Sequence, residues 1–219
     1  GYASYKMIGS QRGGAVAGLL GGMVSSTATT YSFSQRAHVA PALNYIATLA
    51  IILATAVTIP RMAIEIGAVN QQFLASVWPS LLIIFAASLV PVAALWFWHR
   101  SDSGTEAPEI DNPVQLGAAL IFGLLYGIIT LGMAAGEYYY GDAGTYLVSA
   151  ISGLANVDAI TLSSSRLVGQ GRLPVETARN VIVITYMSNL VMKAVLATLI
   201  GNRRLGRAVA ASFAAAFIA

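Results

Sequence analysis

The stretch GGAVAGLLGGMVSSTATT, residues 13–30, changes character halfway along. A glycine-rich apolar half runs into a polar cluster made of Ser25, Ser26, Thr27, Thr29 and Thr30. A second stretch, SAISGLANVDAIT at residues 149–161, does the same, and its polar members are Asn156, Asp158 and Thr161. Each cluster falls about halfway along a long apolar segment, where an unpartnered polar group in lipid costs several kcal/mol. The two stretches therefore predict helices that are interrupted in the middle.

The composition excludes an ordinary water-soluble globule. Of the 219 residues, 57% are hydrophobic and only 10% are charged, which is too few to coat a soluble particle of this size. The net charge of +3 comes from residues placed singly at segment ends, which indicates loop charge near lipid and not a surface that binds nucleic acid. The lipid bilayer is the expected partner, and no cofactor is expected.

Long apolar runs predict an all-α, polytopic bundle with about seven transmembrane helices. The expected spans are 13–36, 41–69, 74–98, 114–139, 144–168, 174–200 and 204 to the end. We expect one membrane domain over residues 1–219, divided into a first repeat at 1–100, an acidic linker at 101–113 and a second repeat at 114–219. The abrupt ends, with a first stretch that resembles the end of an earlier helix, indicate a fragment of a longer chain.

An internal repeat supports this division. One offset places Gly22 to Arg36 over Gly153 to Leu167, with five identical positions: Gly22 with Gly153, Ala28 with Ala159, Thr30 with Thr161, Ser32 with Ser163, and Ser34 with Ser165. If every span crosses the bilayer fully, three spans lie between the matched segments and both run in the same direction. The prediction is two parallel-related repeats with discontinuous helices at 13–36 and 144–168.

Asp158 is the only acid deep inside an expected span, and intramembrane ionisable residues are costly enough to favour a functional role. The alternative is that Asp158 or Asn156 only caps the second half-helix. The hydroxyls of Ser25, Ser26, Thr27, Thr29, Thr30 and Thr161 have their own alternative, because Ser and Thr in membrane helices often bond the carbonyl four residues earlier. We predict that these residues form an ion-binding or substrate-binding site.

Lys193 follows Asn189 by four residues, so both lie on one helix face. Lys193 can pair with Asp158 across the bundle, or it can snorkel towards the interface. Asn189 and Lys193 complete the predicted site. Arg61 and Glu65, four residues apart after Pro60, are most simply a structural pair near a kinked helix end.

No catalytic motif or metal-ligand pattern is present in the sequence. There is no HExxH, GxSxG or GxxxxGK[ST] motif, no Cys, and the two histidines, His38 and His99, are too far apart to indicate a metal centre. We therefore expect neither an enzyme nor a metal site.

At these same residues the sequence resembles the bacterial multi-pass proteins of the domain of unknown function 4010 family, which often accompany an MgtC/SapB-type membrane domain. The stretches that carry the resemblance are GLLGGMVSSTATT with the following Arg36, GDAGTYLVSAISGLANVDAITL at 141–162 and SNLVMK at 188–193. The resemblance implies an all-helical, multi-pass protein of the bacterial inner membrane with no established activity. It also implies an MgtC-like part as a possible partner in the same chain.

Two functions follow from these observations. The first is a transporter or channel for a small cation, or for a cation-coupled solute, through a polar site at the middle of the membrane. The second is a non-transporting regulatory or scaffolding module of the MgtC-associated type, in which the polar residues only hold helices together. The glycine-rich faces also permit a homodimer.

Overall fold

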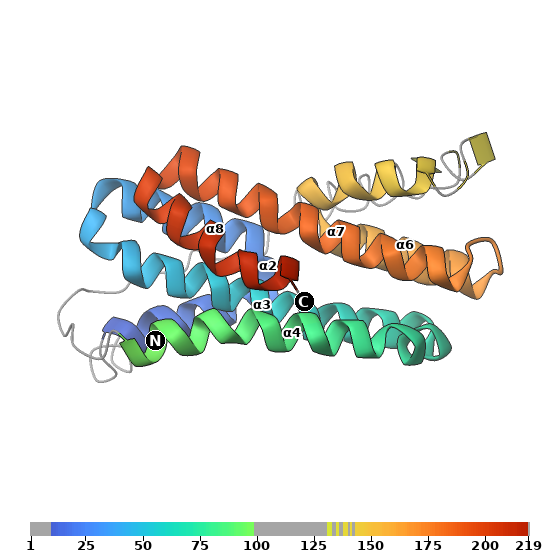
Figure 1. Ribbon diagram of the computed structural model, residues 1–219, viewed down its shortest axis with the longest axis horizontal. Coiled ribbons are helices and arrows are strands. Elements are labelled where there is room, and N and C mark those ends of the chain that lie inside the picture. The colour runs from blue at the N-terminus through green and yellow to red at the C-terminus, as the bar shows by residue number, and fades with distance from the viewer. Residues whose placement is uncertain are drawn as a thin grey trace. The chain divides into compact units, whose positions relative to one another are not determined.

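The computed structural model describes residues 10–98, 131–132, 135, 138–139, 141 and 143–218, and every regular element among them is helical. In chain order these are α2 (Ser10–Val39), the 3-10 helix η1 (Pro41–Leu43), α3 (Asn44–Val69), α4 (Gln71–Trp98), the helical segment Ala143–Ala155, α6 (Val157–Gly169), α7 (Val175–Leu196), the π-helix η2 (Ala197–Gly201) and α8 (Arg203–Ile218). Figure 1 shows their course.

Among the described residues, three helices are long and apolar enough to cross a membrane: Pro41–Val69, Gln71–Phe97 and Val175–Gly201. They agree with three of the predicted spans and indicate a membrane protein. The predicted span 114–139 lies almost wholly outside the described residues, as do the linker 101–113 and the first residues of the chain.

The chain divides into two compact units. Unit 1 comprises the described parts of Gly1–Pro60, Ile83–Asn112 and Lys193–Ala219, and unit 2 those of Arg61–Leu82 and Pro113–Met192. The units do not follow the predicted division into residues 1–100 and 114–219, which stays a prediction. The boundary within α3 falls between Pro60 and Arg61, and Pro60 lies inside the helix.

In unit 1, α2 is interrupted at Ser25, whose φ of −161° and ψ of 106° are extended and not helical. The break divides α2 into a first arm before Ser25 and a second arm after it. The Ser25 hydroxyl accepts a hydrogen bond from the Ala28 amide at 3.2 Å, so Ser25 caps the N-terminus of the second arm. Beyond the break the chain doubles back, and Gly21 comes to lie against Thr29 (Figure 1, blue). In an unbroken helix these residues would be about 12 Å apart along the axis.

The contacts of the first arm with α3 fix its direction. A Cβ atom on Gly14, Gly18 or Gly22 would collide with Ile46, Ala50 or Ala54 respectively. Since the residue numbers of the contacting pairs increase in the same direction along both helices, the first arm of α2 runs parallel to α3. The second arm, which joins them, must run the opposite way. α2 is therefore a helical hairpin with its tip at Ser25.

Unit 2 contains an equivalent hairpin, made of Ala143–Ala155 and α6. Asn156 separates them with φ −156° and ψ 122°, and its side chain accepts a hydrogen bond from the Asp158 amide at 2.8 Å. Three pairs again rise together: Asn180 with Tyr146, Thr185 with Ser149, and Asn189 with Gly153. Ala143–Ala155 is thus parallel to α7, and α6 returns between them.

These hairpins do not confirm the prediction of parallel-related repeats. That prediction required 13–36 and 144–168 to cross the membrane fully, whereas each segment turns back at its break. Within unit 2, Arg61 contacts Asp158, and Asn70 lies near Gly169, so the end of α3 runs in the same direction as α6. It therefore runs opposite to α7.

The close glycine contacts generate a test of the fold. A Cβ on Gly22 would lie 2.5 Å from the Ala54 Cα, so Gly22→Ala must push the arm away from the α3 backbone. We expect a loss of about 1–3 kcal/mol of stability. The matched control is Gly67→Ala, where the nearest atom is the flexible end of Leu74 at 3.0 Å, and helix propensity favours Ala by about 1 kcal/mol. Thermal unfolding in detergent measures both; equal midpoints would contradict the close packing.

Candidate functional site

The tip of the second hairpin carries a cluster of charged side chains, all within unit 2. Arg61 Nη2 lies 2.6 Å from Asp158 Oδ1 and 2.8 Å from Oδ2, and Arg61 Nε lies 3.8 Å from Glu65 Oε1. The side chains of Arg61 and Asp158 are each 21% exposed. Two carboxylates share one guanidinium, so the cluster carries a formal net charge of −1 when all three groups are ionised.

The sequence did not assign Arg61 to the site. It was interpreted as half of a structural pair with Glu65, and that contact is present but is longer than the one to Asp158. The available signal was that a carboxylate inside an apolar span needs a positive partner, and that Arg61 and Lys193 are the basic residues furthest from the ends of the expected spans. Sequence alone could not choose, because the choice depends on α6 turning back beside α3.

Asn156 is the N-cap residue of α6, and Asp158 lies in the first turn of that helix. The amide oxygen of Asn156 accepts the hydrogen bond from the Asp158 backbone, so the capping alternative holds for Asn156. The Asp158 carboxylate does not cap; it binds Arg61 instead. An acid in the first turn is also stabilised by the positive end of the helix dipole.

The polar residues of the first tip lie together in unit 1. Thr29 and Thr30 donate to the carbonyls of Ser25 and Ser26 at 2.9 and 2.8 Å, which is the local bonding that the alternative interpretation predicted. The Ser26 hydroxyl accepts a hydrogen bond from Thr58 Oγ1 of α3 at 3.1 Å. Thr27 is partly buried beside them.

Asn189 and Thr161 lie in unit 2 and are buried, with 2% and 0% of their surfaces exposed. Asn189 Nδ2 donates to the Gly153 carbonyl at 2.9 Å, three residues before the break. Asn189 Oδ1 and Thr161 Oγ1 have no hydrogen-bond partner among the residues that the structure describes. Both atoms are therefore buried oxygens that remain open to a ligand.

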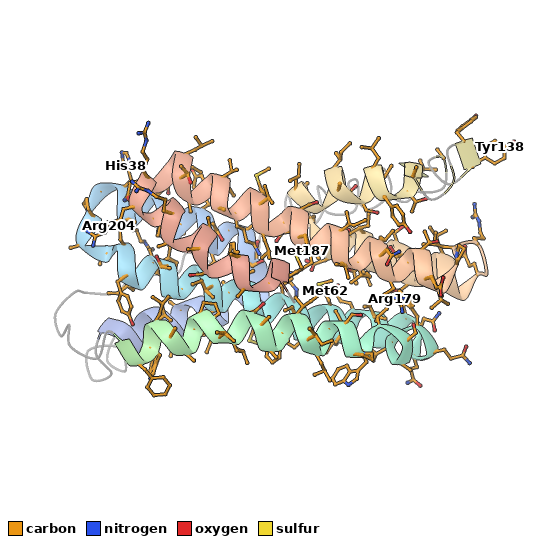
Figure 2. All side chains as sticks on the ribbon, viewed as in Figure 1. His38, Met62, Tyr138, Arg179, Met187 and Arg204 are labelled. Atoms are coloured by element: carbon orange, nitrogen blue, oxygen red, sulfur yellow. The ribbon has the colours of Figure 1, made fainter. Side chains whose placement is uncertain are left out.

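Lys193 is 0% exposed, which argues against snorkelling to an interface. It belongs to unit 1 and Asp158 to unit 2, and their pairing stays a prediction. His38, labelled in Figure 2, lies at the end of α2 with Nδ1 2.8 Å from the Gly201 carbonyl. Among the described residues no group of three or more His, Cys, Asp or Glu side chains could hold a metal ion.

Comparison with known proteins gives two matches and no solved structure. Residues 1–201 match the family model described as Domain of unknown function (DUF4010). An uncharacterized protein of Aquifex aeolicus (strain VF5) is 30% identical over 190 residues, which cover 85% of this chain and 82% of that protein. No solved structure matches. The resemblance stated from the motifs is thereby confirmed, while the association with an MgtC-type domain stays a prediction.

The ion pair generates a second test. Arg61→Met leaves Asp158 without this charged partner, and Asp158→Asn does the converse, so each should destabilise the protein. Because the pair is partly exposed, we expect a coupling energy of about 1–3 kcal/mol in the double-mutant cycle. Unfolding by detergent titration measures it. The matched cycle Arg61→Met with Glu65→Gln tests the longer contact and should give a smaller coupling; strictly additive effects for Arg61 and Asp158 would refute the pair.

Proposed function

Since this chain belongs to the DUF4010 family, whose description assigns no activity, we propose its function from the two hairpin tips. The proposal is a multi-pass transporter or channel of the bacterial inner membrane, which moves a small cation or a cation-coupled solute. About seven membrane segments would surround a polar site at mid-depth, and Asp158 would bind or relay the cation.

The observation that carries this proposal is the pair of interrupted helices with capped polar tips in an apolar chain. Ser25 and Asn156 are both extended and both cap the arm that follows. Non-helical backbone at membrane depth is tolerated where it is buried in protein or lines a water-filled cavity, and transporters build ion sites from such breaks.

The relation between the two halves also supports transport. Ala54 and Thr185, which pack against Gly22 and Gly153, are separated by the same number of residues as those two glycines. The repeat therefore extends into α3 and α7. Internal repeats of this kind are found in many transporter folds.

The charges favour a cation over an anion. The second tip holds Asp158 and Glu65 against the single guanidinium of Arg61, which leaves a formal excess of one negative charge. Within unit 2, the Thr161 hydroxyl would supply a neutral ligand beside this cluster.

One observation favours the scaffolding alternative for the first tip. Its hydroxyls at Ser26, Thr29, Thr30 and Thr58 are all engaged in hydrogen bonds within unit 1, as residues that only hold helices together would be. The test below separates the two functions.

Flux through proteoliposomes tests the proposal. We reconstitute the protein, impose gradients of H⁺, Na⁺ or K⁺, and follow uptake with ion-sensitive dyes inside the vesicles. Asp158→Asn should reduce the flux at least tenfold, because it removes the carboxylate at the tip. Glu176→Gln, which neutralises an exposed acid at the start of α7, should leave the flux within twofold. No flux above empty vesicles for any of the three ions, or equal flux in the Asp158 variant, would sink the proposal.

A further inference from the structure

We infer that the second tip binds a dehydrated alkali cation of the sodium class through two neutral oxygens, Asn189 Oδ1 and Thr161 Oγ1. Its role as a coupling ion rests on the proposed transport function. The binding itself is argued from the contacts of unit 2 alone.

Asn189 places an acceptor at the helix break. Its Nδ2 holds the Gly153 carbonyl at 2.9 Å, which fixes the orientation of the amide. The oxygen of the same amide is buried and has no hydrogen-bond partner among the described residues. A carbonyl oxygen can only accept hydrogen bonds or bind a positive charge, so this atom requires a donor or a cation.

Thr161 differs from three other buried threonines of this fold. Thr30, Thr48 and Thr55 each donate to the carbonyl four residues earlier, at 2.7–2.8 Å. No such bond joins Thr161 to the Val157 carbonyl, and no other described residue bonds its hydroxyl. The Thr161 hydroxyl is therefore buried and does not form the hydrogen bond to the carbonyl four residues earlier that its own helix makes available.

The equivalent residues of unit 1 indicate that these two oxygens converge. At the offset of the repeat, Thr161 corresponds to Thr30, Asn189 to Thr58, and Val157 to Ser26. Thr30 bonds the carbonyl of Ser26 and Thr58 bonds its hydroxyl, so both lie against one residue. In unit 2 a valine replaces that serine and offers no hydroxyl. At the first tip, Thr30 and Thr58 both bond Ser26. At the second tip, the Thr161 and Asn189 oxygens have no hydrogen-bond partner among the described residues.

The ligand class follows from the donor set. Soft and borderline metals favour thiolate or imidazole, and Ca²⁺ and Mg²⁺ favour carboxylates, whereas the two oxygens of this site belong to an amide and a hydroxyl. Neutral oxygens at the carbonyl end of Ala143–Ala155, where the helix dipole is negative, suit a monovalent cation. Asp158, three residues before Thr161, belongs to the cluster with Arg61 and Glu65, whose formal net charge is −1 when all three groups are ionised.

The test is direct binding of ²²Na⁺ to the purified full chain, by scintillation proximity, with choline chloride holding the ionic strength constant. Thr161→Val removes one oxygen at nearly constant volume and should weaken Na⁺ binding at least tenfold. Thr55→Val, its matched control, removes a buried hydroxyl that is bonded within its own helix and should change binding less than twofold. A second variant, Val157→Ser with Asn189→Thr, copies the first tip and should abolish binding.

The outcomes separate this inference from the proposed function. If the wild type does not bind Na⁺, as expected for a tip filled by water alone, the inference is overturned. Unchanged Na⁺ binding in Thr161→Val also overturns it. Either result with flux still lost in Asp158→Asn leaves transport standing without this site. Binding that depends on Thr161, in a protein without flux, establishes the site and removes transport. A variant that loses its cooperative thermal unfolding is replaced by Thr161→Ser, which keeps the oxygen and should retain binding.

Discussion

Every polar backbone group in an apolar solvent must find its partner inside the protein, and this constraint shapes the two hairpins. A helix that stops in such surroundings exposes amide groups at its new N-terminus and carbonyls at its old C-terminus. Ser25 and Asn156 satisfy amide groups at the two breaks, and Asn189 satisfies the Gly153 carbonyl. The breaks are stable because short polar side chains at these positions form hydrogen bonds with the exposed backbone groups.

Glycine makes the rest of the arrangement possible. The first arm of α2 approaches α3 so closely at Gly18 and Gly22 that a methyl group would overlap the α3 backbone, and Gly153 approaches α7 at Thr185 in the same way. Close backbone approach is how membrane helices gain packing energy where lipid supplies no hydrophobic driving force. It also brings Thr58 and Asn189 within reach of the tips.

The sequence allowed prediction of the helical class, three spans, the family and the positions of both breaks, because apolar run length and a mid-run change to Ser, Thr and Asn are local signals. It could not predict that each segment turns back, since Ser25 in an extended conformation permits a kink as readily as a reversal. For the same reason it missed Arg61 as the partner of Asp158. That contact joins residues on different helices, and only the reversal of α6 creates it.

Pro60 has a mechanical consequence for the charged cluster. A proline inside α3 removes one backbone hydrogen bond of the helix, so α3 bends most easily at Pro60. The next residue is Arg61, whose guanidinium neutralises Asp158. Bending of α3 at Pro60 would therefore move the Arg61 guanidinium first. That group sets the electrostatic potential at the start of α6, where Asp158 lies.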